Sequence, residues 1–272
     1  MKVRMYNVGF GDCFCLRDRK KSLLVDFGTN NSRIEGHPRR EIFDVIISDL
    51  STIKSKNLLL THFHMDHLSG LLYMMKKKDI SVDFGKIYLP DVFSKKEMSR
   101  TLVLLLLADL LKESGLPSRQ VSLFALVDAL LENKQNVELL SRGKLFENKY
   151  QALWPDTDVI RKETDEVYNR ICEDGKFKEV MDVLLEFAEK LRLIVWSMTA
   201  EGNKPAETVE KETDSTASEL TEQPEVRQKI IRAYVYEREF RRIKALPDFK
   251  KLLAWLNENQ INLRQFKHKI SI

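Results

Sequence analysis

The opening stretch of the chain consists of short segments in which apolar and polar residues alternate. Residues 2–7 show this pattern, and two further segments, 13–18 and 20–29, follow a turn that contains Gly9 and Gly11. Alternation with a period of two is typical of half-buried β-strands, and glycines between such strands indicate tight turns. The first thirty residues therefore predict a β-meander.

The period then changes from strand to helix and back. The segment 41–53 has apolar residues at helical spacing, namely Ile42, Val45, Ile46, Leu50 and Ile53. Residues 56–62 (KNLLLTH) contain three successive leucines and are typical of a short apolar strand buried on both faces. A helix is expected from residue 67 and another strand over 84–91. The order β-β-β-α-β-loop-α-β predicts an α/β fold.

The remainder of the chain is mostly helical in pattern. Two leucine-rich amphipathic segments lie between residues 94 and 140, and residues 149–158 resemble one more strand, which stops at Trp154–Pro155. Residues 161–199 predict a long helical stretch. Its apolar residues recur at spacings of three and four: Val180, Val183, Leu184, Phe187, Leu191 and Ile194.

The charge balance reverses towards the end of the chain. Residues 200–225 carry eight acidic residues against two lysines and no aromatic residue, so we expect a mobile linker. Residues 227–269 carry twelve Lys or Arg against four acidic residues, with aromatic residues interleaved. This basic segment predicts short helices that either face a nucleic acid or bury their aromatic residues beneath a solvated charged face. The final residues, 267–272, resemble the beginning of a strand.

Composition narrows the class of protein. The chain has 272 residues and a formal net charge of +4, which is too mild to indicate nucleic-acid binding by itself. Its apolar runs fall short of the roughly 20 residues of a membrane-spanning helix, and we expect no membrane span and no secretory signal. The three cysteines form no CxxC pair, which favours reduced thiols in a cytoplasmic protein.

A cluster of histidines follows the buried strand at 56–62. His62, His64, Asp66 and His67 fall within six positions, although the whole chain has five histidines. Residues two apart on an extended segment project to the same side, and the turn into the following helix brings the next two side chains nearby. Neutral imidazole and carboxylate are ligands that Zn²⁺ prefers. The cluster therefore predicts a metal site on a rigid strand.

These motifs resemble those of the metallo-β-lactamase superfamily. The resemblance rests on THFHMDHLSG (61–70), NVGFGDCFCL (7–16) and SLLVDFGT (22–29). In particular the chain is similar to the hydrolase domain of bacterial DNA-uptake (competence) channel proteins and to related stand-alone hydrolases. Segments YQALWPD (150–156) and KISI (269–272) resemble later strands with lower specificity. The implied fold is an αββα sandwich, here incomplete and with helical insertions.

The resemblance implies a role for each member of the cluster. His62 and His64 would bind a first zinc ion, and Asp66 and His67 a second. The two ions would hold and acidify a water, and the resulting metal-bound hydroxide would attack a carbonyl or phosphorus centre. Asp66 would both ligate the metal and orient the hydroxide, so it is the expected catalytic residue.

Residues outside the cluster receive supporting roles from the same resemblance. Asp26 would hydrogen-bond and brace the metal loop, or alternatively cap local backbone at its strand end. Gly9 and Gly11 would let the first hairpin turn tightly beside the site. Asp12 would hydrogen-bond within that turn or serve as an ordinary turn residue.

The site implied by the resemblance is only partly present. A complete two-metal site uses about seven ligands, and the later ones lie in motifs resembling TGD and HHGS, neither of which occurs here. His37 and His268 are the remaining histidines, and we expect neither to be a ligand. Because the chain stops within an apparent strand at Ile272, we expect the N-terminal portion of a longer hydrolase.

Two functions follow as hypotheses. The first is a zinc-dependent hydrolase acting on a phosphodiester such as DNA or a nucleotide, with ester, thioester and lactam substrates left open. The second is a catalytically inactive remnant whose inserted helices bind a protein partner. The expected organisation is the N-terminal half-domain at 1–93, a helical insertion at 94–144, a core strand at 145–160, a helical insertion at 161–199, the acidic linker at 200–226, the basic helical segment at 227–266 and a truncated core strand at 267–272.

Overall fold

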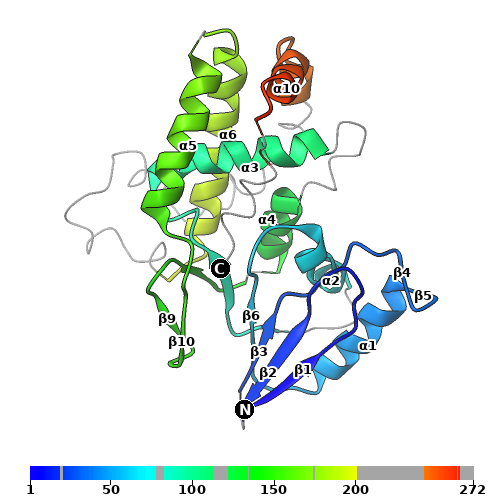
Figure 1. Ribbon diagram of the computed structural model, residues 1–272. Coiled ribbons are helices and arrows are strands. Elements are labelled where there is room, and N and C mark those ends of the chain that lie inside the picture. The colour runs from blue at the N-terminus through cyan, green and yellow to red at the C-terminus, as the bar shows by residue number, and fades with distance from the viewer. Residues whose placement is uncertain are drawn as a thin grey trace.

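A six-stranded mixed sheet forms the centre of the computed structural model (Figure 1). The structure describes residues 1–18, 21–77, 83–112, 122–133, 135–173, 175–200, 242–261 and 263. The strand order is β1-β2-β3-β6-β7-β8. The strands of this sheet are β1 (Lys2–Met5), β2 (Phe14–Asp18), β3 (Lys21–Val25), β6 (Lys56–Leu59), β7 (Ile87–Pro90) and β8 (Val137–Leu140).

The sheet is antiparallel at one edge and parallel at the other. The pairs β1–β2 and β2–β3 are antiparallel, as the predicted meander requires, with Leu16 opposite both Val3 and Leu23. The pairs β3–β6, β6–β7 and β7–β8 are parallel. Parallel neighbours need a crossover connection, which α1 (Arg39–Ser51) and α2 (Met65–Lys76) supply between successive strands. The carboxyl ends of β3, β6, β7 and β8 consequently meet at one edge of the sheet.

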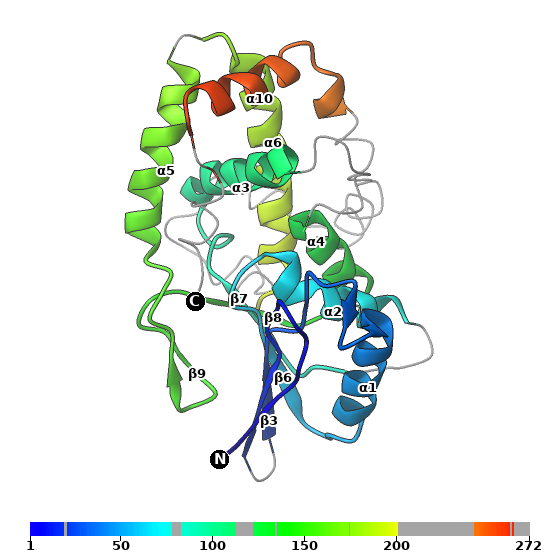
Figure 2. The ribbon, with the colours of Figure 1, turned by 45° about the vertical axis from the view of Figure 1, so that its right-hand side comes forward.

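Helices α1 and α2 cover one face of the sheet (Figure 2). Leu24, Leu58 and Ile87 are fully buried beneath them and belong to the main hydrophobic core. The buried stripe of α1 differs from the expected one, since Val45 is 67% exposed. The stripe that packs inward consists of Phe43, Ile46, Ile47 and Leu50.

A small hairpin covers part of the opposite face, which corrects the expectation of a core strand at 145–160. Strands β9 (Leu145–Phe146) and β10 (Tyr150–Gln151) pair only with each other within the described residues. Phe146 and Ala152 pack on Leu23, Leu59, Tyr88 and Leu140. Glu147 in the turn accepts hydrogen bonds from the Tyr88 hydroxyl at 2.7 Å and from the Asn57 amide. The segment therefore covers one face of the sheet with Phe146 and Ala152 instead of adding a strand to it, while Leu145 and Leu153 are exposed.

A strand interrupts the segment 94–144, which was expected to be a helical insertion. Two helices form as predicted, α3 (Ser99–Lys112) and α4 (Ser122–Glu132), and a short 3-10 turn, η1 (Lys96–Met98), precedes them. Residues Val137–Leu140 then add β8 to the parallel side of the sheet. This strand has four residues and follows the leucine-rich helix α4 closely, so the pattern alone could not separate it from the helix.

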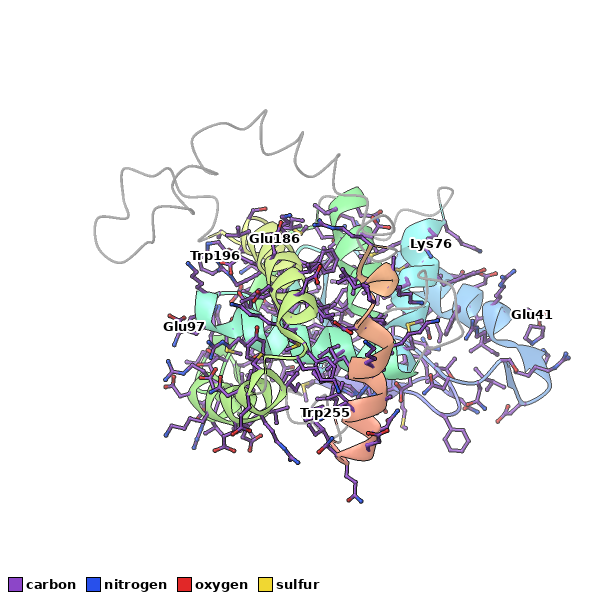
Figure 3. The ribbon with its side chains drawn as sticks, turned by 90° about the horizontal axis from the view of Figure 1, so that it is seen from above. Glu41, Lys76, Glu97, Glu186, Trp196 and Trp255 are labelled. Carbon is purple, nitrogen blue, oxygen red and sulfur yellow. The ribbon has the colours of Figure 1, made fainter. Side chains whose placement is uncertain are left out.

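The remaining helices form a second layer with α3. These are α5 (Thr157–Cys172), α6 (Lys178–Trp196) and, from the basic segment, α10 (Phe249–Glu258). Seen from above, α10 with Trp255 lies over this layer (Figure 3), and the Trp255 ring lies 5.7 Å from that of Phe177. The expected stretch at 161–199 is thus helical, but it consists of two helices, because α5 ends at Cys172 and α6 begins at Lys178.

Three of the expected segments lie wholly or partly outside the described residues. The acidic linker at 200–226 is described only at residue 200, and the strand at 267–272 is not described. The basic segment at 227–266 is described at 242–261 and 263. A minor hairpin, β4 (Arg33–Ile34) with β5 (His37–Pro38), was not expected from the pattern. In the part of the chain that the structure describes, none of the helices has both the length and the apolar character needed to cross a membrane.

Candidate metal centre

The histidine cluster lies at the edge of the sheet where β3 and β6 end. Asp26 directly follows β3, while Thr61 and His62 follow β6 in the adjacent position of the sheet. Asp26 has a left-handed backbone conformation, with φ of 54°, which aspartate tolerates better than most residues. The parallel pairing of two strands thus brings residues 35 positions apart in sequence into contact.

Asp26 accepts three hydrogen bonds from the metal loop, the segment 61–67 that contains the histidine cluster. Its Oδ1 atom accepts from the Thr61 backbone N–H at 2.8 Å, and its Oδ2 atom lies 2.7 Å from the Thr61 hydroxyl. The same Oδ2 atom lies 3.0 Å from Nδ1 of His67. Asp26 is only 2% exposed, so its carboxylate has lost most of its hydrogen bonds to water. The contacts with Thr61 and His67 replace them. Asp26 therefore joins the end of β3 to both ends of the metal loop.

The three imidazole rings lie against one another. The ring centroids of His62 and His64 are 4.8 Å apart, and those of His62 and His67 are 3.6 Å apart. The Nε2 atom of His67 lies 3.8 Å from Oδ2 of Asp66. Two ligands of one tetrahedral zinc ion, each about 2.0–2.2 Å from it, lie roughly 3.4 Å apart, so this separation suits a shared ion. The predicted residues are therefore brought together by the fold, and their donor chemistry fits zinc.

Asp12 approaches the same cluster from the loop between β1 and β2. Its Oδ2 atom lies 3.5 Å from Nδ1 of His67, and its side chain is 43% exposed. Its backbone N–H donates to the carbonyl of Asp66 at 3.3 Å, and its own carbonyl accepts from the Gly28 N–H at 3.2 Å. One oxygen each of Asp12 and Asp26 and a nitrogen of His67 lie within 4.8 Å of one another and could hold a metal ion.

Two glycines allow three backbone segments to meet behind the site. A Cβ atom on Gly11 would lie 2.2 Å from the Gly28 carbonyl oxygen and 2.7 Å from that of Asp66. A Cβ atom on Gly28 would lie 2.6 Å from the backbone nitrogen of Leu68. These distances are too short for any side chain, so both positions require glycine. Gly9, the other glycine of the expected turn, has φ of 69° and supports the sharp reversal there.

The electrostatics of the site centre on His67, which is 8% exposed. Burial lowers the pKa of its imidazole, but the hydrogen bond with Asp26 and the negative charges of Asp26, Asp66 and Asp12 outweigh this effect. The net result is a pKa raised above its ordinary value. The surrounding carboxylates thus favour positive charge at this position, which is what a cation-binding site requires.

Sequence reasoning found most of these residues but missed several that support them. Thr61, which links Asp26 to the histidines, was not singled out although it immediately precedes His62. Gly28 was also missed, because a close approach of backbone segments leaves no periodic signal. His37 lies in β5, is 65% exposed and contacts Glu41 at 3.3 Å, as expected for a histidine outside the site. His268 lies outside the described residues.

Comparisons with known proteins agree with this geometry. Residues 6–90 match the model of the metallo-beta-lactamase superfamily, and this part of the chain therefore carries a domain of that superfamily. The mixed α/β fold is consistent with it. A curated relative, Endoribonuclease YSH1 from Mycosarcoma maydis, is 32% identical over 77 residues, which are 28% of this chain and 8% of the relative. The chain thus spans a small part of that protein. No solved structure matches the chain significantly.

Proposed function

We propose that the chain carries a zinc site of a metallo-β-lactamase-type hydrolase, with His62, His64, Asp66 and His67 as ligands. The observation that carries the proposal is the convergence of three imidazoles and the Asp66 carboxylate at the carboxyl edge of two parallel strands. Asp26 already accepts three hydrogen bonds, so its proposed role is to brace the ligands. Asp12 lies 3.5 Å from the same Nδ1 atom of His67, so its proposed role is likewise to orient that ring.

Each residue has a distinct task in the proposed reaction. Bound zinc would lower the pKa of a water molecule and neutralise negative charge that develops on the substrate. Asp66, which is 31% exposed and faces Nε2 of His67, would accept a hydrogen bond from the attacking water and orient it towards the substrate. Asp26 and the buried leucines of β6 would hold the imidazoles in place, so that little reorganisation accompanies the reaction.

A phosphodiester is the proposed substrate class, and RNA its first candidate. The support is the match to the endoribonuclease of Mycosarcoma maydis, which extends over 77 residues. The similarity to hydrolase domains of DNA-uptake channels would give DNA instead. The same metal loop is compatible with either, because recognition of the nucleic acid would come from residues outside it.

Metal analysis of the purified protein tests the zinc site. We expect about two zinc ions per chain if the site accommodates both metal positions, and loss of zinc in His64→Ala. His37→Ala is the matched control, because His37 is exposed and lies outside the site. Zinc that remains after His64→Ala, or that is lost equally in His37→Ala, would contradict the proposal. Cleavage of labelled RNA and DNA by the zinc-loaded protein, compared with Asp66→Asn, then tests the substrate class.

A specific feature also favours the alternative of a protein-interaction module. Val3 and Met5 are 60% and 72% exposed, and both lie on the sheet face that carries the β9–β10 hairpin. Exposed apolar side chains on a sheet commonly mark an interaction surface. Two results together would favour the interaction module over the hydrolase. The protein would bind zinc but cleave no phosphodiester, and the double variant Val3→Lys with Met5→Lys would be more soluble than the wild type.

A further inference from the structure

We infer that Thr61 is a positioning residue, which passes the influence of the Asp26 carboxylate to His62 and thereby selects the tautomer of that imidazole. The inference rests on the proposed zinc site and adds a role for a residue beside it. The Thr61 hydroxyl oxygen lies 2.7 Å from Oδ2 of Asp26 and 2.9 Å from Nδ1 of His62. The Thr61 hydroxyl therefore bridges the buried Asp26 carboxylate and the imidazole of His62, the first histidine of the motif.

The positions of the hydrogen atoms follow from counting donors. A carboxylate has no proton to donate, so the short contact between the two oxygens requires the Thr61 hydroxyl to donate to Asp26. The hydroxyl has a single hydrogen, and once it is used the Thr61 oxygen can only accept. The contact with His62 therefore requires a proton on Nδ1 of that ring. In the neutral imidazole, the lone pair is then on Nε2.

The same carboxylate acts directly on His67. The Nδ1 atom of His67 lies 3.0 Å from Oδ2 of Asp26, so this ring also donates from Nδ1 and keeps its lone pair on Nε2. The Nε2 atom is the one that faces Asp66, at 3.8 Å. A single aspartate thus prepares two imidazoles as Nε2 ligands, one by a direct hydrogen bond and the other through Thr61. Hydrogen bonds of this kind fix the orientation of metal-binding histidines and increase their basicity.

Thr61 also fixes its own position through the backbone. Its N–H donates to Oδ1 of Asp26 at 2.8 Å while its hydroxyl donates to Oδ2, so the two oxygens of one carboxylate hold a single residue. This two-point attachment leaves the hydroxyl oxygen facing the ring of the next residue. Serine could make the same contacts, whereas valine has a similar shape but no hydroxyl.

The tautomer is measurable in the metal-free protein. Long-range ¹H–¹⁵N correlation spectra distinguish protonation at Nδ1 from protonation at Nε2 and are recorded at alkaline pH, where the rings are neutral. We expect the Nδ1–H form for both His62 and His67 in the wild type and in Thr61→Ser. In Thr61→Val, His62 should shift to a mixture of tautomers while His67 keeps the Nδ1–H form. An Nε2–H signal for His62 in the wild type would overturn the inference even if the valine variant failed to fold.

Zinc titration separates this inference from the proposed function. Thr61→Val should weaken zinc binding about 10-fold or more, and Thr61→Ser should stay close to wild type. In an Asp26→Asn background the same Thr61→Val change should add little, because the negative charge that the relay transmits to His62 is already absent. If the wild type shows the expected tautomers but binds no zinc, the proposed zinc site fails and the relay stands. If zinc binds but Thr61→Val retains full affinity, Thr61 has no positioning role.

Discussion

The Oδ2 atom of Asp26 lies 3.0 Å from Nδ1 of His67, across 41 positions of sequence. The two residues are 2% and 8% exposed, so the contact is shielded from water. It forms because β3 and β6 are adjacent parallel strands whose carboxyl ends meet, which places the residue after one strand beside the loop after the other. The relationship means that a change at Asp26 should affect the metal ligands without removing any of them.

Asp26→Asn tests this relationship. Asparagine keeps the size of aspartate and tolerates the left-handed backbone, so strain is not introduced. It has one acceptor oxygen where aspartate has two, so at least one of the three donors around it loses its partner. We expect zinc affinity to fall about 10- to 100-fold and the free energy of unfolding to fall by about 1–3 kcal/mol. Zinc titration and urea unfolding of the metal-free protein measure the two effects separately, and unchanged zinc affinity would contradict the bracing role.

Gly28→Ala tests the close approach of backbone segments behind the site. The added Cβ atom would lie 2.6 Å from the nitrogen of Leu68 and 2.7 Å from the carbonyl oxygen of Asp66, so the metal loop must shift. Overpacking of this kind costs roughly 1–3 kcal/mol or more of stability, and we expect zinc binding to weaken as well.

Gly36→Ala is the matched control for this prediction. Gly36 has φ of 85° but no atom within 4 Å of a Cβ at that position, so its substitution strains the backbone without a clash. It should lower stability by about 1 kcal/mol and leave zinc binding unchanged. The interpretation of Gly28 as a steric requirement would be wrong if both variants had the same effect on zinc binding.

The sequence pattern predicted the parts of the fold that local chemistry specifies. The helices at 99–112, 122–132 and 178–196 carry enough residues to show their period, while the glycine turn and the histidine cluster mark the ends of the short strands of the meander and of the strand before His62. β8 has four residues and the β9–β10 hairpin has two in each strand, and neither has a comparable marker in the sequence. Their positions depend on which sheet face or edge is still uncovered after the rest has folded, which is a property of the tertiary structure.

The candidate site shows the same division. The histidines and Asp66 were found because chemically distinctive residues crowd together in sequence. Thr61 and Gly28 are common residue types whose roles depend on atoms 35 or more positions away, from Asp26 in one case and from Asp66 and Leu68 in the other. No local signal reports such contacts, and only the pairing of β3 with β6 reveals them.

A buried pair of hydroxyls joins the helical layer. Thr101 on α3 and Thr164 on α5 are both fully buried, and their hydroxyl oxygens are 3.0 Å apart. Thr164→Val would leave the Thr101 hydroxyl with the Met98 sulfur at 3.9 Å, a weak acceptor. We expect this single change to lower the free energy of unfolding by about 1–3 kcal/mol.

The double variant Thr101→Val with Thr164→Val provides the control. It replaces both hydroxyls by methyl groups of the same shape, so no polar group is left without a partner and most of the lost stability should return. Urea unfolding of the four proteins gives the coupling between the two residues. Additive losses in the double variant would show that the hydroxyl pair itself does not stabilise the layer.

Asp156 makes the stability of α5 dependent on pH. Its Oδ1 atom accepts from the backbone N–H groups of Asp158 and Val159 at the start of the helix, and Oδ2 lies 3.1 Å from Arg142. The hydrogen bond from Val159 comes first among the interactions that hold the pKa of this carboxyl below its ordinary value, and Arg142 comes second. A lowered native pKa means that the unfolded chain takes up the proton more readily than the folded one. The stabilisation is therefore fully present above the ordinary pKa of about 3.9 and is lost as the pH falls through the lower native pKa.

Asp156→Asn isolates this contribution, because asparagine can still cap the helix but carries no charge. We expect the wild type to unfold at a higher temperature than Asp156→Asn at neutral pH, and the difference to vanish in acid as the wild-type carboxyl is protonated. Asp156→Ala, which also loses the cap, should be less stable than Asp156→Asn throughout. Thermal unfolding across this pH range measures all three proteins. A difference between wild type and Asp156→Asn that stays constant down to strongly acidic pH would mean that the charge of Asp156 does not stabilise the helix, because protonation would then remove nothing that the amide lacks.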